Sequence, residues 1–262
     1  MSARPASPDR RGFALVTGAA RRLGAAFARA LAADGWFVRL HCNVSAAEAE
    51  AAAAAIRAAG GRCDLARADL ADPAALPALL APPEGGPAFA ALLVNSASIF
   101  DYDTPATTTA GHLARNHAVN AAAPVLLAQA LAAQLPAEAR GLVVNLLDQK
   151  LAHPNPDFFA YTLSKAALGT ATTLMAQAYA PCLRVNAIAP GITLPSADQT
   201  EAEFHAAQAL APLGYGATPD DLVAALRFLI AAEATTGQTI FVDGGQSLRA
   251  EPRDVMYTVR GG

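Results

Sequence analysis

Short runs of hydrophobic residues alternate along the chain with longer segments in which apolar positions recur every three or four residues. The short runs predict strands at about residues 13–17, 36–41, 62–66, 92–95, 142–147, 183–188 and 239–242. The longer segments predict helices at about 22–34, 45–59, 111–135, 158–179 and 219–230, with a short helix after Pro73. This alternation predicts an α/β fold, a doubly wound parallel sheet of seven strands with helices on both faces.

The two ends of the chain and one internal segment lack this pattern. We expect residues 1–11 to form a flexible N-terminus, residues 12–248 a single domain, and residues 249–262 a C-terminal tail. The tail is expected either to reach the pocket of a neighbouring subunit or to fray. Residues 191–218 are rich in Ala, Pro and Gly, which is typical of a mobile lid, and we expect this lid and Tyr215 to shape substrate choice.

Composition and charge narrow the class of protein. Of the 262 residues, 53% are hydrophobic and 16% are charged, which suits one large core. A formal net charge of −3 gives no reason to expect a nucleic-acid partner, and the first apolar run is too short for a signal peptide or a membrane span. The three cysteines have no metal-ligand spacing, so we expect no metal site and reduced thiols in a cytoplasmic protein.

A glycine-containing loop joins the first predicted strand to the first predicted helix. It reads Thr17-Gly18-Ala19-Ala20-Arg21-Arg22-Leu23-Gly24. Gly18 permits a tight turn and Gly24 lets the helix approach the sheet closely, so that free N–H groups at the helix N-terminus face a pyrophosphate. A plain turn is the alternative, but the position after the first strand favours a dinucleotide site of the Rossmann type.

The end of the second predicted strand indicates which dinucleotide binds. An acidic residue there would bind the ribose 2′-hydroxyl of NAD and repel the 2′-phosphate of NADP. The chain instead reads Leu40-His41-Cys42-Asn43-Val44-Ser45, with no carboxylate before Glu48. Arg21 and Arg22 can reach a phosphate with planar guanidinium groups, and Ser45 can add its hydroxyl and N–H. The sequence therefore predicts NADP(H).

Tyr161 and Lys165 lie four residues apart in a predicted helix, so their side chains point to the same face. A phenol ordinarily has a pKa of about 10, and a neighbouring ammonium is expected to lower that pKa. Such a phenol can donate a proton while a hydride arrives from a nicotinamide. An ordinary helix face would show the same spacing, but the position after the fifth strand favours a catalytic role.

The order and spacing of these motifs resemble the short-chain dehydrogenase/reductase family. The resemblance covers residues 12–248 and rests on the glycine loop, Asn95-Ser96-Ala97-Ser98, Asn120, Tyr161 with Lys165, Arg184-Val185-Asn186 and Pro190-Gly191. It implies that Asn120 holds a water linked to Lys165, that Asp69-Leu70 contacts adenine, and that residues 190–193 lie beside the nicotinamide. The implied cofactor-binding residues are Gly18, Arg21, Arg22, Leu23, Gly24, His41, Asn43, Ser45, Asp69, Leu70, Asn95, Ser96, Ala97, Tyr161, Lys165, Pro190, Gly191 and Ile192.

One departure from the family pattern narrows the chemistry. Most members carry serine thirteen positions before the tyrosine, where its hydroxyl binds a substrate carbonyl, but here that residue is Asp148. A carboxylate would repel a developing alkoxide, so it suits a substrate that presents N–H groups or a C=N bond that needs a proton. Pteridine reductases and dihydromonapterin reductases carry aspartate at this place. The structural alternative is that Asp148 caps a turn or pairs with Lys150.

The glycine loop is also very similar to that of pteridine reductases, with Arg22 where most of the wider family has glycine. This resemblance implies that Arg22 contacts cofactor phosphate and the pterin, that Ser98 binds the pterin, and that Phe100 stacks on it. Phe100 is equally compatible with a packed hydrophobe. Val44 departs from the pattern, since arginine often stands there, and this weakens the 2′-phosphate site.

Together these features predict NADPH-dependent reduction of a pterin or dihydropterin. The predicted catalytic residues are Asp148, Tyr161, Lys165 and Asn120, and the predicted substrate-binding residues are Arg22, Ser98, Phe100, Asp148 and Tyr161. The alternative enzyme is a 3-oxoacyl or other carbonyl reductase. A protein that senses NADPH without turnover is disfavoured by the intact proton relay. The family resemblance also implies a homotetramer in which the last two helices form contacts.

Overall fold

The computed structural model describes residues 12–196 and 199–259, so the prediction for residues 1–11 lies outside the described residues. One parallel sheet of seven strands crosses the protein in the order β3-β2-β1-β4-β5-β6-β7, which confirms the predicted doubly wound α/β fold. The strands are β1 (Phe13–Thr17), β2 (Phe37–Cys42), β3 (Arg62–Arg67), β4 (Ala90–Asn95), β5 (Gly141–Leu146), β6 (Leu183–Pro190) and β7 (Thr239–Val242).

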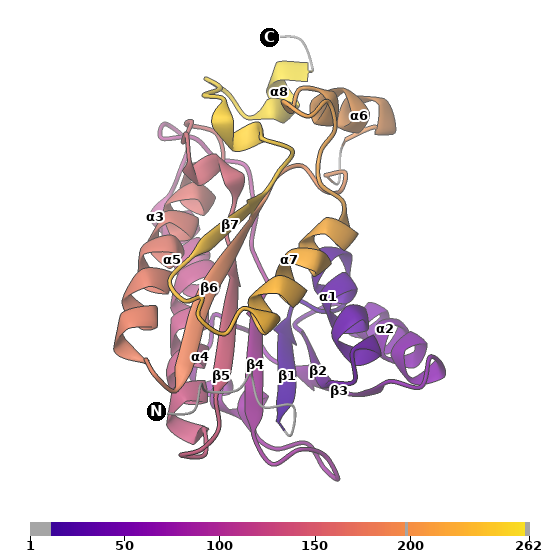
Figure 1. Ribbon diagram of the computed structural model, residues 1–262. Helices are drawn as coiled ribbons and strands as arrows, with labels where there is room; N and C mark the ends of the chain where they lie inside the picture. Colours follow the sequence, from indigo (N-terminus) through magenta and orange to yellow (C-terminus); the bar gives the residue numbers. More distant parts are fainter. Residues whose placement is uncertain (1–11, 197–198, 260–262) are drawn as a thin grey trace.

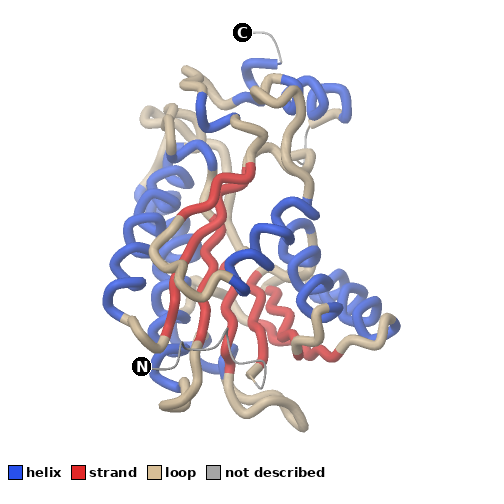
Figure 2. The backbone as a smooth tube through the Cα atoms, in the orientation of Figure 1, coloured by secondary structure: helices blue, strands red, loops and turns tan. Residues whose placement is uncertain are grey.

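Two layers of helices cover the sheet (Figures 1 and 2). One layer consists of α1 (Arg22–Ala33), α2 (Ala46–Ala58) and α7 (Pro219–Ala231), which share a hydrophobic core with one face of the sheet. The other layer consists of α3 (Ala110–His117), α4 (Ala123–Gln134) and α5 (Phe159–Ala178). Residues of α4 and α5 pack with the opposite face of the sheet in a second core.

The central strands are hydrophobic along their whole length because both faces of the sheet are covered. Every residue of β1, β4 and β5 is buried, which explains why these strands read as continuous apolar runs rather than as alternating patterns. The order of strands reverses between β1 and β4. In doubly wound sheets a ligand crevice forms at such a point, outside the carboxyl ends of the strands. The fold therefore places the predicted site at this edge.

The loop between β1 and α1 leaves no room for side chains at its two glycines. Gly18 has φ +66°, and a Cβ there would lie 2.9 Å from Ala97 Cα. A Cβ at Gly24 would overlap the carbonyl oxygen of Gly18. Gly18 thus lets the loop pack against Ala97, and Gly24 lets α1 approach the end of β1 closely, as the sequence predicted.

Two helical regions differ from the sequence prediction. The helix predicted over residues 111–135 is interrupted, because a π-helical turn, η3 (Ala118–Ala122), separates α3 from α4. The helix predicted after Pro73 consists of two 3₁₀ turns, η1 (Pro73–Ala75) and η2 (Pro77–Leu80). Ser45 precedes α2 as expected, but its side chain makes no capping hydrogen bond.

The segment predicted to be an irregular lid contains a helix, α6 (Glu201–Ala209). The side chain of Thr200 accepts from the Glu203 N–H while Glu203 accepts from the Thr200 N–H, so a complete capping box starts this helix. The sequence signal was present in Thr200-x-x-Glu203, since this pattern often starts a helix. Regular structure therefore extends further into residues 191–218 than their composition suggested.

The described part of the C-terminal tail is ordered rather than frayed. Its described part, residues 249–259, contains α8 (Val255–Val259), which packs beside α6 above the carboxyl ends of β6 and β7 (Figure 1). The tail does not fray over these residues, because Met256 is buried and Arg253 pairs with the buried carboxylate of Asp157. Contact of the tail with a neighbouring subunit stays a prediction. Residues 260–262 lie outside the described residues.

Across residues 12–196 and 199–259, none of the helices combines the length and apolar character needed to cross a membrane. The thiols of Cys42, Cys63 and Cys182 are all free, as the sequence predicted. Cys42 is buried at the end of β2, and burial raises the pKa of its thiol. Burial also raises the pKa of the Cys63 thiol, so both groups favour the neutral thiol form.

Replacing Gly24 with Ala should lower the free energy of unfolding by about 1–3 kcal/mol, because the added methyl group overlaps a backbone oxygen in a packed loop. Urea unfolding followed by circular dichroism measures this loss. Gly111→Ala is the matched control, since its Cβ would meet no atom nearer than Thr109 Oγ1 at 3.7 Å. Equal destabilisation by the two substitutions would contradict the packing role of Gly24.

Candidate active site

Three of the predicted catalytic side chains meet at the carboxyl edge of the sheet. The Tyr161 hydroxyl on α5 donates a hydrogen bond to Asp148 Oδ2 over 2.8 Å. Lys165, one turn further along α5, donates from Nζ to the carbonyl oxygen of Leu146 at 2.7 Å. Tyr161 and Lys165 are both buried. The end of β5 and one face of α5 thus bring a phenol, a carboxyl group and an ammonium together.

Asp148 uses its two carboxyl oxygens for different purposes. It follows β5 and caps the 3₁₀ turn η4 (Gln149–Leu151), where Oδ1 accepts from the Lys150 N–H at 2.8 Å. The other oxygen, Oδ2, accepts from Tyr161. Burial raises the pKa of the Asp148 carboxyl, although the hydrogen bonds from Lys150 and Tyr161 oppose this shift. Asp148 therefore both caps a turn, which was the structural alternative, and contacts Tyr161, the predicted proton donor.

The pKa of Tyr161 shifts opposite to the direction predicted from the sequence. Burial, followed by the charge and the hydrogen bond of Asp148, raises the pKa of the phenol well above its ordinary value. The Lys165 ammonium lies 5.6 Å from the phenol ring centroid and bonds to Leu146. Burial lowers the pKa of Lys165 to about 8, against the opposing charge of Asp148. Tyr161 is thus a firmly protonated group whose direct partner is the carboxyl of Asp148.

Asn120 ties the loop after β4 to α5. Its Oδ1 accepts from the Ile99 N–H at 2.8 Å, and its Nδ2 donates to the Ile99 carbonyl at 3.0 Å and to Ser164 Oγ at 3.0 Å. Ser164 in turn donates to the carbonyl oxygen of Tyr161. The completely buried Asn120 side chain therefore positions the segment that carries Phe100. The water linked to Lys165 stays a prediction.

Phe100 forms part of an aromatic cluster and keeps exposed surface. Its ring stacks on Phe158 with centroids 4.0 Å apart and planes at 14°, and it meets the edge of Tyr161 at 4.7 Å. Phe100 is nevertheless 44% exposed. The packed and the ligand-facing interpretations of this residue are therefore compatible. Ser98 is exposed nearby, and its hydroxyl bonds to the Ile99 carbonyl at 3.3 Å.

His41 holds the glycine loop through hydrogen bonds with Gly18 and Ala19. Its Nδ1 accepts from the Gly18 N–H at 3.2 Å, so Nε2 carries the proton and donates to the Ala68 carbonyl at 3.2 Å. The backbone carbonyl of His41 also accepts from the Ala19 N–H. Burial lowers the pKa of the imidazole, although the bond to Ala68 and the charge of Asp69 oppose this shift. A neutral imidazole thus holds the loop in place.

A row of buried polar side chains fixes the ends of the central strands. Thr17 Oγ1 accepts from the N–H groups of Ser96 and Ala97 at 3.0 and 3.1 Å. Asn95 donates to Asn145 Oδ1 at 2.8 Å, and Asn145 donates to Thr172 Oγ1 on α5 at 2.9 Å. Asn145 and Thr172 were not singled out from the sequence. Their signal was the occurrence of polar residues in an apolar strand and helix, because buried polar groups need partners.

Several basic and polar groups gather where β2 and β3 end, near the start of α2. Arg21 lies 4.0 Å from Glu48 of α2, and both side chains are exposed. Arg67, which pairs with Cys42 in the β2–β3 register, donates to the Asn43 carbonyl at 2.8 Å. Sequence reasoning missed Arg67, although its position at the end of a strand beside β2 was a usable signal. Ser45 is partly exposed in the same region.

Arg22 contacts the lid segment. Its guanidinium donates to the carbonyl oxygens of Pro195 at 2.7 Å and Leu194 at 3.5 Å. Burial, followed by the charge of Arg21, lowers the pKa of Arg22. Arg22 has φ +52°, a conformation that glycine adopts more readily, which fits its place where most of the resembling family has glycine. The side chain thus links the glycine loop to the lid.

The remaining predicted cofactor residues lie around the same edge of the sheet. Gly191, directly after Pro190 at the end of β6, donates its N–H to Val242, and a Cβ there would lie 2.7 Å from Asp243 Cβ. The Ile192 N–H donates to Gln246 Oε1 at 3.2 Å. At the other end, Asp69 is exposed and Leu70 is buried, while Leu23 is partly buried in α1.

The start of α5 depends on residues far away in the sequence. Asp103 is buried, and both its carboxyl oxygens accept from the Ala160 N–H, at 3.0 and 3.2 Å. Asp157 is also buried and bonds to Tyr102 and Arg253. Sequence analysis singled out none of these residues, because no local pattern marks partners separated by 55 to 96 positions.

A phenol paired with a carboxyl group, at the carboxyl edge of a parallel sheet that also carries a glycine loop at its reversal point, is typical of dinucleotide-dependent oxidoreductases. A sequence profile of the family described as Enoyl-(Acyl carrier protein) reductase matches residues 18–247. The chain belongs to the short-chain dehydrogenase/reductase family.

Relatives within the family carry different activities in their names. The crystal structure of FolM alternative dihydrofolate reductase 1 from Brucella canis, complexed with NADP, is 40% identical with a TM-score of 0.88, covering 94% of this chain and 97% of that one. Pteridine reductase 1 from Leishmania tarentolae is 31% identical, covering 95% of this chain and 99% of the relative. 3beta-hydroxysteroid dehydrogenase 1 from Eggerthella lenta is 32% identical, covering 89% and 93%. Family membership alone therefore does not decide the substrate.

The neutral state of His41 gives the fold a pH dependence. The folded pKa is lowered, so the unfolded chain takes up a proton at about pH 6.5 before the folded protein does. The contribution of His41 to stability is thus complete above about pH 6.5 and decreases as the pH falls toward the folded pKa. Urea unfolding between about pH 7.5 and 5.5 measures this slope.

His41→Gln should flatten the slope, whereas His205→Gln, at an exposed position of α6, should leave it unchanged. If the slope of the His41→Gln protein matches that of the unmodified protein, the buried imidazole does not control this pH dependence.

Proposed function

We propose that the protein reduces a C=N bond of a pterin or dihydropterin and uses NADPH as the hydride donor. The observation that carries the proposal is the 2.8 Å hydrogen bond from the Tyr161 hydroxyl to Asp148 beside the partly exposed ring of Phe100. A carboxyl group at this position disfavours an alkoxide and favours a substrate with N–H donors. The names of the Brucella FolM and Leishmania relatives support the same substrate class.

Several features support NADP(H) as the cofactor. No carboxylate stands at the end of β2 before Glu48 of α2, and Glu48 is already near Arg21. Arg21, Arg67 and the unused hydroxyl of Ser45 surround this region and suit a 2′-phosphate. The related Brucella canis structure is a complex with NADP. Arg67 supplies a positive charge in the region where Val44 replaces the arginine of pteridine reductases.

Each side chain of the site has a role in the proposed reaction. Bound NADPH would supply the hydride that adds to the carbon of the C=N bond. Tyr161 donates its proton to the nitrogen, so the product carries a C–H and an N–H bond. After this transfer the Tyr161–Asp148 pair takes up one proton from solvent, and Asp148, whose pKa is raised by burial, can accept that proton and pass it to the phenolate through their hydrogen bond. Lys165 holds the backbone of Leu146 in place next to this pair.

Substrate recognition is assigned to the loop after β4. The exposed part of Phe100 offers a flat surface for a heterocycle, and its other contacts to Phe158 and Tyr161 keep the ring in place. Ser98 lies exposed two residues earlier and is available for a polar contact. Arg22 links the glycine loop to the lid through Leu194 and Pro195, which supports a role for this cation in contacting both the cofactor phosphate and the substrate.

A side-by-side assay of NADPH oxidation tests this function with dihydrobiopterin, dihydrofolate and an acetoacetyl thioester. The unmodified protein should turn over a pterin in preference to the thioester. Asp148→Ser should lower kcat/KM for the pterin by about 10²-fold, since a general acid–base group is removed, and should affect the thioester less. Tyr161→Phe should abolish both reactions, as it removes the proton donor.

Two outcomes would contradict the proposal. Preference for the thioester over every pterin tested would favour the carbonyl reductase. Equal losses on both substrates after Asp148→Ser would remove the role assigned to this carboxyl group.

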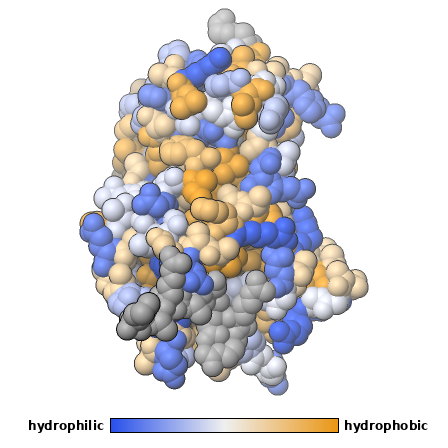
Figure 3. All heavy atoms as spheres, viewed as in Figure 1, coloured by the Kyte–Doolittle hydropathy of each residue, from blue (hydrophilic) through white to orange (hydrophobic). Residues whose placement is uncertain are grey.

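We also propose that the protein assembles as a homotetramer. Large apolar side chains are exposed on α5 and α7, the last two helices of the sequence prediction, and on β7. They are Leu163, Leu174, Phe228 and Phe241, which are 43–58% exposed. Hydrophobic residues gather around β7 and α7 on the face shown in Figure 3.

Light scattering should give about four times the chain mass of 26.7 kDa. Phe228→Glu should reduce that mass because it places a charge in a contact; a monomer before substitution would contradict the tetramer.

A further inference from the structure

The C-terminal tail is fastened to the residue that precedes the left-handed start of α5. Arg253 Nε donates to Asp157 Oδ2 at 2.7 Å, and the Asp254 N–H donates to the same oxygen at 2.8 Å. The second oxygen of Asp157 accepts from the Tyr102 hydroxyl at 3.1 Å. Asp157 is only 1% exposed. Two consecutive tail residues therefore satisfy a buried carboxylate that otherwise has one protein hydroxyl as its partner.

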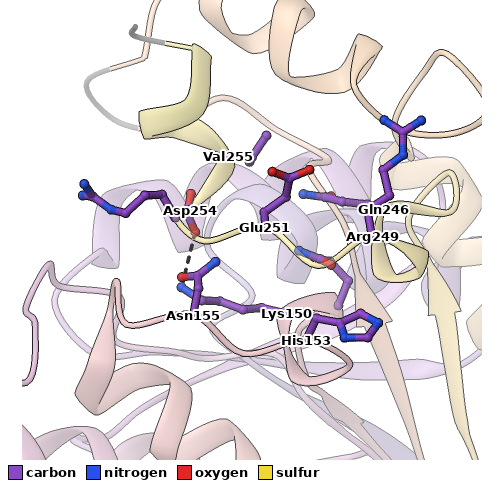
Figure 4. Close-up of a pocket in the computed structure, with 10 residues that line it drawn as sticks. Lys150, His153, Asn155, Gln246, Arg249, Glu251, Asp254 and Val255 are labelled. Atoms are coloured by element: carbon purple, nitrogen blue, oxygen red, sulfur yellow. Dashed lines mark ion pairs between the residues drawn. The ribbon is translucent and has the colours of Figure 1, made fainter. Parts of the chain in front are cut away.

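A second tail contact reaches the segment that carries Asp148. Lys150 is 5% exposed, and its Nζ lies 3.6 Å from Asp254 Oδ2 and donates to the carbonyl oxygen of Asp157. Figure 4 shows this ion pair where the tail passes over the turn that carries Lys150. The backbone N–H of the same Lys150 donates to Asp148 Oδ1. The tail thus contacts the short turn η4, which Asp148 caps, and Asp148 is the residue that accepts the hydrogen bond from Tyr161.

Phe158 connects the clamped segment to the substrate side of the site. It has φ +52°, which a bulky residue adopts only where its surroundings hold it. Its ring stacks on Phe100, while Tyr102 meets it at 5.3 Å and Tyr257 of the tail lies at 6.5 Å. Phe158 immediately precedes α5, which carries Tyr161. Movement of Phe158 would therefore shift both the aromatic wall and the proton donor.

We propose that residues 253–257 are a positioning element of the active site. Arg253 and Asp254 hold Asp157, and Asp157 fixes the left-handed Phe158, so that Phe100 and Tyr161 keep their places. The substrate class in this inference rests on the proposed function, whereas the placement of Phe158 does not. The family profile ends at residue 247, so this element lies beyond the part of the chain that the profile matches.

The charge balance at Asp157 explains why the contact orders the segment. Burial would raise the pKa of Asp157, but the bonds from Arg253, Asp254 and Tyr102 hold that pKa below its ordinary value. Without Arg253 the buried carboxylate loses the guanidinium that pairs with it, and the chain before α5 loses one of its fixed contacts. The expected result is a loosened Phe158 rather than an unfolded protein, because the sheet and its two cores lie elsewhere.

The test compares Arg253→Gln, Asp157→Asn and the double variant in the full chain. Arg253→Gln should raise KM for dihydrobiopterin and lower kcat/KM about 10-fold through misplacement of reacting groups, with the Kd for NADPH unchanged. Arg57→Gln is the matched control, since it removes another arginine–carboxylate pair, with Glu50 on α2. The kcat/KM of the double variant should be close to that of the more impaired single variant, because both substitutions break the same contact between Arg253 and Asp157. Arg253→Lys, which keeps the charge, should recover part of the loss.

Amide hydrogen exchange gives a readout that needs no substrate. In Arg253→Gln, the Thr162 amide, which bonds to the Phe158 carbonyl, should exchange faster than in the unmodified protein and in Arg57→Gln. The inference would be overturned if Arg253→Gln showed the same amide exchange and the same kinetics as Arg57→Gln. It would also be overturned if the losses in kcat/KM of the two single variants multiplied in the double variant. If the unmodified protein reduces no pterin, the proposed function fails, while the exchange experiment still decides the role of the tail.

Discussion

The hydrogen bond between Tyr161 and Asp148 constrains most of what surrounds it. A phenol and a carboxyl group stay 2.8 Å apart in a partly buried site only if the strand end and the helix that carry them are both fixed. Asn145 and Thr172 join β5 to α5 one layer deeper, and Lys165 joins the same two elements through Leu146. The polar contacts of this region therefore all help to keep the distance between the Tyr161 hydroxyl and the Asp148 carboxyl group constant.

The parallel sheet was predictable because burial on both faces leaves an unbroken apolar run for each central strand. The pair of Tyr161 and Asp148 was also accessible, since helical spacing and a departure from a family pattern both point to it. The direction of the Tyr161 pKa shift was not. The separation of four residues indicates that Lys165 lies near Tyr161. Only the folded structure shows that the Lys165 ammonium bonds to the Leu146 carbonyl, while the phenol hydroxyl bonds to the carboxyl group of Asp148.

Other features were missed for two different reasons. The helix α6 had a local signal in Thr200 and Glu203, which composition concealed because its surroundings are rich in Ala, Pro and Gly. The contacts of Asp157 with Tyr102 and Arg253 had none, as they join three separate segments of the chain. Interactions of this kind follow from the completed fold, so reading along the chain does not reveal them.

The direction of the strands has a practical consequence for handling the protein. Since all strands run parallel, β1 begins at the amino edge of the sheet, whereas α8 lies above the opposite, carboxyl edge (Figure 1). A peptide fused directly after α8 would start on the side of the sheet that carries Asp157 and Lys150. A tag placed ahead of β1 would start from the far side, which makes the amino end the better attachment point for purification or surface immobilisation.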